Sequence, residues 1–460
     1  MSWPRFAIVG HPNKGKSSIV ATLAEDDAVA ISPQPGTTTQ ARTYPMRLEG
    51  EVLYELIDTP GFQRARELLA WLESRDRGAG ARADVVREFL REHATDARFN
   101  DERELLTPIV QGAGILYVVD GSRPYGRQYE AEMEILRWTG RPRMALINMI
   151  SAGDYVEEWR AALSQYFSIV RVFDAMRADF GKRIELLRAF GAIDESWSAQ
   201  LNRAADALIA ERARRKRQAA GAIADLLTAV LTATVTMPLR DSEAAPEVEA
   251  EARRRLQEAV RRHERAEQRI VQEIYRHPGL AAREATSTAL TEDVFSERSF
   301  SVFGLSTTQL AMTGAASGAV AGSLVDAALG GASLLLGAGI GAAIGAIGAL
   351  AGADRLAKVQ ILGQALGGFE LRVGPITDPN LPWVVLGRAL LHLRLVAERN
   401  HARREELVVD AEGTHLGDAI GPVQRRRLEG VFRALRRDRG LDAARRASFV
   451  AEIESLVETP

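Results

Sequence analysis

The amino-acid sequence predicts an α/β phosphate-binding domain, with a mostly parallel sheet and flanking helices, followed by a mostly α-helical domain. Three observations predict this arrangement. A glycine-rich loop lies between a short apolar run and a helical segment near the N-terminus, further loop motifs follow it in order, and the second half consists of long charged or glycine-rich segments. We place the first domain at residues 1–190 and the second at residues 195–460, which leaves each domain enough chain for its own core.

The composition narrows the classes of function. The net charge is −2, so no strong positive field attracts nucleic acid and we expect no DNA partner. The chain contains no cysteine, which excludes disulfides and thiolate metal sites, and its seven histidines show no metal-ligand spacing. No basic region followed by an apolar run begins the sequence, so we expect a cytoplasmic protein.

Residues 10–17 read Gly-His-Pro-Asn-Lys-Gly-Lys-Ser and match the phosphate-binding pattern GxxxxGK[ST] in full. The apolar run at residues 6–9 predicts a buried strand before the loop, and a helix is expected from residue 18 onward. In this context backbone N–H groups and the helix N-terminus bind phosphate, Lys16 reaches the β- and γ-phosphates, and the Ser17 hydroxyl binds Mg²⁺. The candidate nucleotide-binding residues of this loop are Asn13, Lys14, Gly15, Lys16, Ser17 and Ser18.

Two further loops supply groups that a nucleotide switch requires. Residues 35–39 are threonine-rich, and a threonine there reaches Mg²⁺ and senses the γ-phosphate. Residues 51–57 predict a strand that ends in Asp-Thr-Pro-Gly at residues 58–61. Asp58 is expected to anchor Mg²⁺ from the carboxyl end of this strand, and the Gly61 N–H to contact the γ-phosphate.

These motifs, together with the strand Ile-Leu-Tyr-Val-Val-Asp at residues 115–120, resemble the Era/TrmE/EngA-like branch of bacterial GTPases over residues 1–190. The whole arrangement resembles bacterial proteins in which such a GTPase precedes a long uncharacterised domain. The resemblance implies GTP and GDP as ligands, with a homodimer formed through the GTPase domain as one possible assembly. It also implies Mg²⁺ at Ser17, Thr38 and Asp58, and catalytic roles for Lys16, Thr38 and Gly61.

Two positions within these motifs bear on mechanism. Asn13 matches the asparagine with which members of this branch hold K⁺ beside the phosphates; the alternative is an asparagine turn that stabilises the loop. Phe62 stands where Ras-like enzymes carry a catalytic glutamine, and an apolar side chain cannot orient the attacking water. We therefore expect slow basal hydrolysis that K⁺ accelerates and Na⁺ does not, with Gln63 as a nearby side chain able to swing into the site.

The base-recognition motif departs from the family pattern NKxD. After an expected strand at residues 143–147 the chain reads Asn-Met-Ile-Ser at residues 148–151, so only Asn148 remains. The missing aspartate accepts hydrogen bonds from guanine, and its loss weakens discrimination against adenine. Asp154 is a substitute if the loop folds back, and the later loop at residues 174–176 is degenerate as well. Guanine specificity therefore rests on the resemblance, and an adenine-binding or relaxed-specificity enzyme stays open.

Between residues 62 and 114 the chain is longer than a minimal GTPase needs. We expect a helix, a break at residues 78–80 and a charged helix to about residue 98. Such an insertion either reports the nucleotide state to another domain or forms a solvated surface extension.

The second half carries no catalytic constellation. Helices are expected at residues 198–236 and 247–276, where mixed Arg and Glu favour solvated faces over a partner-binding arm. A strand is expected at residues 369–373 and a helix at residues 383–404. The sequence shows no KH-like GxxG loop in its proper surroundings, so binding of RNA or the ribosome by this half is unsupported.

Residues 309–353 contain one charge and glycines that recur every four residues. This spacing places the glycines on one helix face and predicts a glycine-zipper hairpin. Its two arms are long enough to span a bilayer, but their Ala and Gly content suits a buried hairpin in a soluble domain equally well. The expected location is therefore the cytoplasm, with attachment to the inner face of the cytoplasmic membrane through this hairpin as the alternative.

Together these features predict an enzyme that hydrolyses GTP to GDP and phosphate and thereby switches the conformation or association of the helical domain. The alternatives are a relaxed-specificity NTPase, a nucleotide-loaded scaffold with negligible turnover, and a ribosome-assembly factor.

Overall fold

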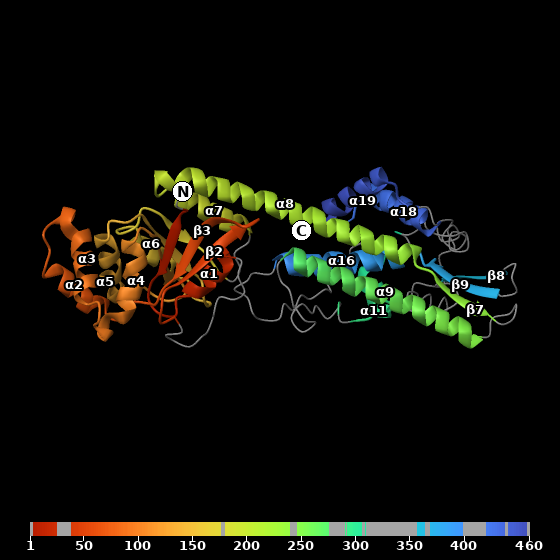
Figure 1. The fold of residues 1–460 in the computed structure, drawn as a ribbon, viewed down its shortest axis with the longest axis horizontal. Coiled ribbons are helices and arrows are strands. Elements are labelled where there is room, and N and C mark those ends of the chain that lie inside the picture. Colours follow the sequence, from red (N-terminus) through yellow and green to blue (C-terminus); the bar gives the residue numbers. More distant parts are fainter. Residues whose placement is uncertain are drawn as a thin grey trace, which may run out of the picture. The chain divides into compact units, whose positions relative to one another are not determined.

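The computed structural model describes residues 3–24, 38–175, 180–239, 246–275, 290, 292–305, 309, 357–363, 369–398, 420–437 and 440–457. The chain divides into two compact units, the first running from Met1 to Glu211 and the second beginning at Arg212. Figure 1 labels many of the helices and strands of both units, coloured along the chain.

The first unit is built on a six-stranded sheet with the strand order β2-β3-β1-β4-β5-β6. Its strands are β1 (Arg5–Val9), β2 (Arg42–Leu48), β3 (Glu51–Asp58), β4 (Gly114–Asp120), β5 (Arg143–Asn148) and β6 (Val170–Val172). All neighbouring pairs are parallel except β2 and β3, which are antiparallel. The mostly parallel sheet expected from the sequence is confirmed, and the antiparallel edge strand β2 was not predicted.

Alternating side chains of the central strand β1 enter two separate apolar layers. Phe6 and Ile8 pack in one layer, with α1 (Lys16–Ala24), α7 (Phe180–Gly191) and the N-terminal part of α8 (Glu195–Thr232). Ala7 and Val9 pack in the other layer, with α2 (Ala65–Glu73), α3 (Arg82–Glu92), α4 (Asn100–Val110), α5 (Glu130–Trp138) and α6 (Val156–Leu163). A strand buried on both faces needs apolar residues at every position, which explains the continuous apolar run at residues 6–9.

The segment between β3 and β4 packs against the sheet through all three of its helices. Leu68 of α2, Val86 of α3 and Leu105 of α4 are fully buried in the same apolar layer as Val9. The expected break near residues 78–80 is present as the short turn η1 (Ala79–Ala81), but α3 ends at Glu92 and the separate helix α4 was not predicted. The insertion is therefore part of the core of the first unit rather than a solvated extension.

Parallel pairing brings the polar ends of several strands to one edge of the sheet. Ile8 of β1 lies opposite Asp58 of β3, and Asp120 of β4 lies opposite Asn148 of β5. Because parallel strands end at the same edge, the loop that follows β1 meets these side chains there.

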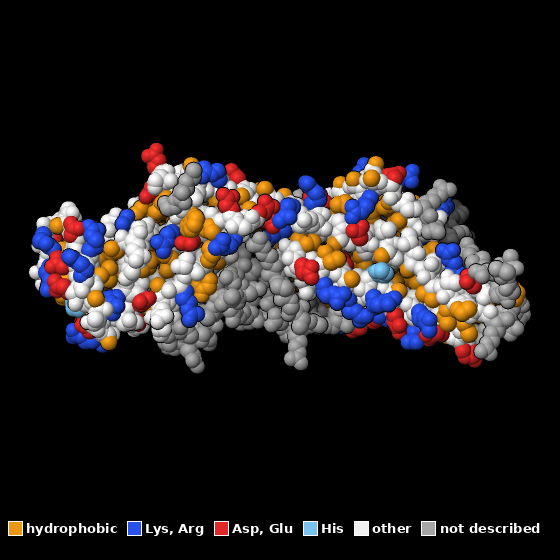
Figure 2. Space-filling model, viewed as in Figure 1, with side chains coloured by type: hydrophobic (Ala, Val, Ile, Leu, Met, Phe, Trp, Pro, Cys, Tyr) orange, Lys and Arg blue, Asp and Glu red, His pale blue; other side chains and the backbone are white. Residues whose placement is uncertain are grey.

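The second unit is mostly helical, as expected. Among the described residues its helices are the C-terminal part of α8, α9 (Pro246–Ile274), the short α11 (Glu297–Phe303), α16 (Leu381–Glu398), α18 (Pro422–Arg436) and α19 (Ala443–Leu456). The expected helices at residues 198–236 and 247–276 are confirmed within a few residues, and the one expected at 383–404 spans residues 381–398 in the structure. On the face shown in Figure 2, basic side chains gather over α9.

A small antiparallel sheet accompanies these helices. Its strands are β7 (Val235–Leu239), β8 (Ala357–Gly363) and β9 (Phe369–Ile376), paired in the order β7-β9-β8. The strand expected at residues 369–373 is confirmed as part of β9, whereas β7 and β8 were not predicted.

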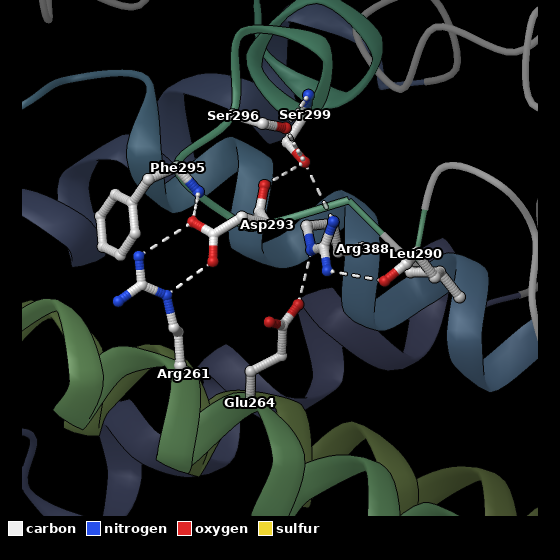
Figure 3. A network of polar contacts seen from close by, with 8 residues as sticks. All are labelled: Arg261, Glu264, Leu290, Asp293, Phe295, Ser296, Ser299 and Arg388. Carbon is white, nitrogen blue, oxygen red and sulfur yellow. Dashed lines mark hydrogen bonds and ion pairs between the residues drawn. The ribbon is translucent and has the colours of Figure 1, made fainter. Parts of the chain in front are cut away.

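A buried polar network joins α9, α11 and α16 (Figure 3). Arg388 of α16 donates to Glu264 of α9 at 2.5 Å, to the Ser299 hydroxyl at 3.0 Å and to the Leu290 carbonyl at 3.2 Å. Arg388 is only 3% exposed, so these charge-assisted bonds offset the cost of burying its guanidinium. The network fixes how the three elements pack.

The predicted glycine-zipper hairpin at residues 309–353 lies outside the described residues except for Gln309. Within the part of the chain that the structure describes, no helix has both the length and the apolar character needed to cross a membrane.

Candidate functional site

The loop between β1 and α1 has the backbone of a phosphate-binding loop. Gly10, Asn13 and Gly15 all have positive φ angles, of 143°, 61° and 76°. A Cβ atom on Gly15 would lie 2.3 Å from the Asn148 amide nitrogen, so both the backbone angle and the space require glycine here. The loop passes directly into α1 at Lys16, which places the helix N-terminus at the site.

A cavity of about 130 Å³ lies against this loop. Its walls are residues 12–18, Thr38, Thr39, Thr59, Gly61, Gln63 and Asp101. The structure thus brings together Asn13, Lys14, Gly15, Lys16, Ser17, Ser18, Thr38 and Gly61, which the sequence analysis had selected as site residues.

Lys16 is held at the base of the cavity by the loop itself. Its Nζ donates to the Gly10 carbonyl at 3.3 Å and to the His11 carbonyl at 3.1 Å. Burial lowers the pKa of Lys16 to about 8, while the negative charges of Asp58, Glu132 and Asp101 act in the opposite direction. A desolvated ammonium group of this kind interacts strongly with an anionic phosphate.

One carboxylate oxygen of Asp58 accepts hydrogen bonds from two hydroxyl groups. Ser17 Oγ donates to Asp58 Oδ2 at 2.8 Å, and Thr38 Oγ1 donates to the same oxygen at 3.1 Å. The other oxygen, Oδ1, is buried without a hydrogen-bond partner among the described residues. Burial raises the pKa of Asp58, and the bond from Ser17 and the charge of Lys16 oppose that effect. Two hydroxyls and a carboxylate form an oxygen donor set that suits Mg²⁺.

The position after the Asp-Thr-Pro-Gly motif is not in the cavity. Phe62 is 1% exposed and packs in the apolar layer that contains α2 to α6. Gln63 and Asp101 line the cavity instead. Glu102, fully buried on α4, accepts from the backbone N–H of Gln63 at 2.9 Å and of Arg64 at 2.5 Å. Asp101 was missed by the sequence analysis, because an acidic residue in the first turn of a helix is common and carries no distinct signal.

Gly61 is required by close contact with the phosphate-binding loop. A Cβ atom at this position would lie 2.6 Å from both the backbone nitrogen and Cδ of Pro12. The backbone of the Asp-Thr-Pro-Gly motif therefore packs directly on the loop at Gly61, and Thr59 and Gly61 line the cavity.

The side-chain amide of Asn148 forms hydrogen bonds with two loops. Its Nδ2 donates to the Lys14 carbonyl at 3.1 Å, and its Oδ1 accepts from the Ala175 backbone N–H at 3.1 Å. Met176 lies outside the described residues. Asp154, the expected substitute for the missing aspartate, accepts from the Val156 N–H at the start of α6 at 3.2 Å. The surviving asparagine therefore links the phosphate-binding loop, through its Nδ2, to the loop at Ala175, through its Oδ1.

The side chain of Lys14 points toward the end of β4. It is 6% exposed, and its Nζ lies 3.6 Å from Asp120 Oδ2. Asp120 also accepts at Oδ1 from the hydroxyl of Ser122 at 2.5 Å. Ser122 in turn accepts from the hydroxyl of Ser151 at 2.8 Å, so that Ser151, the fourth residue of the degenerate base motif, is linked to a buried carboxylate.

The fold and this site define a P-loop GTPase domain. The family model described as "50S ribosome-binding GTPase" matches residues 5–149. The model described as "Domain of unknown function (DUF3482)" matches residues 160–455, which is more than half of the chain. The chain therefore belongs to the DUF3482 family, with a GTPase domain preceding the family's domain of unknown function.

Curated relatives match part of the chain. GTPase Der from Pseudothermotoga lettingae is 25% identical over 214 residues, covering 46% of this chain and 43% of its own. GTPase Der from Mycoplasma pneumoniae is 36% identical over 86 residues, covering 18% of this chain and 19% of its own. The chain thus spans less than half the length of these relatives. Among solved structures, Era from Aquifex aeolicus bound to GDP and AlF4⁻ has 18% identity and a TM-score of 0.30, covering 42% of this chain and 57% of that one.

Proposed function

We propose that this protein binds GTP and GDP with Mg²⁺ and hydrolyses GTP slowly at the cavity beside the phosphate-binding loop. The observation that carries the proposal is the convergence of the Ser17 and Thr38 hydroxyls on one oxygen of Asp58, next to the buried Lys16 ammonium. A divalent cation and a phosphate chain are the ligands that such a combination of groups suits.

Each group has a role that follows from its place. Lys16, which donates to two loop carbonyls, would exchange these bonds for β- and γ-phosphate oxygens. Ser17 and Thr38 would hold Mg²⁺, with Asp58 orienting both hydroxyls, and the metal would neutralise negative charge on the phosphates. The Gly61 N–H would bind the γ-phosphate, since its backbone already lies against the loop.

The attacking water must be oriented by a residue other than Phe62, because that side chain is buried in the core. Gln63 and Asp101 both line the cavity, and each carries a side-chain oxygen able to accept a hydrogen bond from water. Glu102 holds the backbone of Gln63, so both groups are positioned by α4.

K⁺ is proposed as an accelerating ion bound beside Asn13. Asn13 lines the cavity with its side chain exposed, and its backbone has a φ of 61°, which asparagine tolerates better than most residues. Asn13→Gly keeps this backbone angle and removes the amide. Hydrolysis of GTP by the wild type should be faster in KCl than in NaCl. Equal rates for Asn13→Gly in the two salts would assign this effect to Asn13. Equal rates for the wild type in the two salts would remove K⁺ from the proposal.

We propose a GTPase domain at residues 1–190 and a helical domain at residues 195–460. The nucleotide bound by the first is proposed to change the conformation or association of the second. The support is that the two matched domains, the GTPase domain and the domain of unknown function, are joined in one chain. We further propose membrane attachment through residues 309–353, which vesicle flotation tests. A homodimer formed through the GTPase domain is tested by analytical ultracentrifugation. Binding to ribosomes is tested by co-sedimentation. One solved structure shows Era in complex with nucleotides 1506–1542 of 16S ribosomal RNA. That RNA contact is a property of Era.

The test is nucleotide binding and multiple-turnover phosphate release by the full chain with Mg²⁺. We expect GTP to displace a fluorescent analogue and to be hydrolysed repeatedly, and Lys16→Ala to lose both properties while Lys182→Ala, an exposed lysine on α7, keeps them. Binding with no turnover would support a scaffold instead. Equal hydrolysis of ATP and GTP would support a relaxed-specificity NTPase.

A further inference from the structure

A buried glutamate of α5 anchors the second residue of the phosphate-binding loop. Glu132 is 2% exposed, and its Oε1 lies 2.8 Å from Nδ1 of His11. Its other oxygen, Oε2, accepts from the hydroxyl of Tyr117 on β4 at 2.9 Å. The carboxylate therefore connects the loop to a strand of the six-stranded sheet and to a helix that packs on this sheet. The described residues that form the cavity walls include neither His11 nor Glu132.

The direction of both hydrogen bonds follows from the chemistry of the three groups. Burial raises the pKa of Tyr117 well above its ordinary value, and the charge of Glu132 adds to this effect. The phenol therefore keeps its hydrogen and donates it to the carboxylate. An ionised carboxylate accepts only, so the hydrogen between Glu132 and the imidazole is carried by His11 Nδ1. His11 thus donates to a carboxylate that Tyr117 holds in place from the other side.

The anchored residue also takes part in the phosphate site through its backbone. Lys16 Nζ donates to the His11 carbonyl at 3.1 Å and to the Gly10 carbonyl at 3.3 Å. The loop around His11 depends on uncommon backbone angles, since φ is 143° at Gly10 and 61° at Asn13. Such angles persist only where surrounding contacts fix them. The bond between His11 and Glu132 is a contact of this kind.

A second basic side chain of the loop is held in the same region. Lys14 Nζ lies 3.6 Å from Asp120 Oδ2 and 5.7 Å from the centre of the Tyr129 ring. The imidazole of His11 meets the same ring edge-on, with ring centres 5.4 Å apart. Only the contact of His11 with Glu132 is within hydrogen-bond distance, so it is the more specific of the two anchors.

We propose that Glu132 is a positioning residue of the nucleotide site, which fixes His11 and thereby holds the phosphate-binding loop in the shape that receives phosphate. This inference rests on the proposed nucleotide binding and adds to it a residue outside the cavity walls. A loop that is ordered before the ligand arrives loses less conformational entropy on binding. Loss of a charge-assisted hydrogen bond that maintains this order should weaken GDP binding about 10-fold.

The test is a double-mutant cycle on the full chain with Mg²⁺, measured as the dissociation constant of GDP. His11→Ala should raise this constant about 10-fold, and Glu132→Gln about 5-fold, because glutamine keeps the shape and forms a weaker, uncharged bond. In the His11→Ala background, Glu132→Gln should cause no further loss, since Glu132 acts on the loop through His11. The negative charge of Glu132 by itself disfavours a nearby phosphate, so weaker binding by Glu132→Gln reports the lost anchor.

Glu130→Gln is the matched control. Glu130 lies on the same helix and also accepts from a tyrosine, Tyr125, at 3.0 Å, but this pair is exposed. The substitution should leave the GDP dissociation constant unchanged, both alone and together with His11→Ala.

The stability of the same variants separates positioning from folding. His11→Ala takes one partner from the buried Glu132 carboxylate and should lower the free energy of unfolding. Adding Glu132→Gln removes the buried charge, so the double variant should recover part of this stability in urea unfolding. Its GDP affinity should stay low, because the anchor is still missing. A merely structural role of Glu132 predicts instead that affinity recovers together with stability.

The outcomes also separate this inference from the proposed function. Equal GDP affinities of the wild type and Glu132→Gln, or a further loss when Glu132→Gln is added to His11→Ala, overturn the role of Glu132 and leave phosphate binding in place. If His11→Ala alone is too unstable to assay, the comparison of Glu132→Gln with Glu130→Gln still decides. A wild type that does not bind GDP refutes the proposed function itself.

Discussion

Replacing Glu267 with glutamine should remove a large pH-dependent loss of stability from the second unit. Glu267 lies on α9 with 3% of its surface exposed, and neither carboxylate oxygen has a hydrogen-bond partner among the described residues. Burial raises its pKa to about 8, and the charge of Glu264 adds to this effect. The folded chain therefore keeps this proton at pH values where the unfolded chain has released it.

The sign and the size of the pH effect on stability follow from the pKa values of Glu267 in the unfolded and the folded chain. Between pH 4.5 and about 8 the unfolded state is ionised and the folded state is protonated, so the free energy of unfolding falls as the pH rises. The fall is about 1.4 kcal/mol per pH unit, which over this window of about 3.5 pH units amounts to about 5 kcal/mol. A loss of this size is a large share of the roughly 5–15 kcal/mol that stabilises a typical protein.

The assay is urea unfolding followed by circular dichroism at pH 5 and pH 8. Glu267→Gln should change the free energy of unfolding little at pH 5 and increase it by several kcal/mol at pH 8. Glu258→Gln on the same helix is the control, because Glu258 is paired with Arg254 at the surface and should show no such difference. If Glu267→Gln alters stability equally at both pH values, the carboxyl is not held protonated by burial and the reasoning fails.

The remaining predictions concern the site and the polar network. Gly61→Ala should weaken GDP binding at least about 10-fold by forcing Pro12 and the phosphate-binding loop apart, whereas Gly80→Ala, which meets no atom within 4 Å, should bind normally in the same fluorescence titration. Arg388→Met should lower the free energy of unfolding by about 3–5 kcal/mol, since it leaves a buried carboxylate unpaired; a change below about 1 kcal/mol in urea unfolding would contradict this. Asp101→Asn should lower the single-turnover rate of GTP hydrolysis at least about 10-fold with nucleotide affinity maintained, and an unchanged rate would exclude it from orienting water.

The parts of the site that lie in consecutive residues could be predicted from the sequence. The loop at residues 10–17 and the motif at residues 58–61 are short patterns whose chemistry needs a fixed spacing, and both occur at the ends of strands that the structure contains. The central strands were predictable for a related reason, because burial on both faces leaves a continuous apolar run.

The parts that depend on distant residues could not be predicted. Ser122 and Ser151 are 29 residues apart and meet only because β4 and β5 pair in register. Asp101 reaches the cavity through the packing of α4, which no local pattern records. The backbone partners of the Asn148 amide, the Lys14 carbonyl and the Ala175 N–H, lie far from it in the sequence, so the motif alone does not reveal these contacts. Strand β7 is short and half-exposed, and lacks the apolar run that marks β1.

Helix α4 holds the backbone of two different loops through two acidic side chains. Glu102 accepts from the amides of Gln63 and Arg64, and Glu104 accepts from the amide of Ala41 at 2.9 Å, just beyond the threonine-rich loop. A displacement of this one helix would loosen both loops at once. A regulator that binds α4 would therefore control turnover without contacting the nucleotide. Its binding would change the rate of amide hydrogen exchange at these backbone positions.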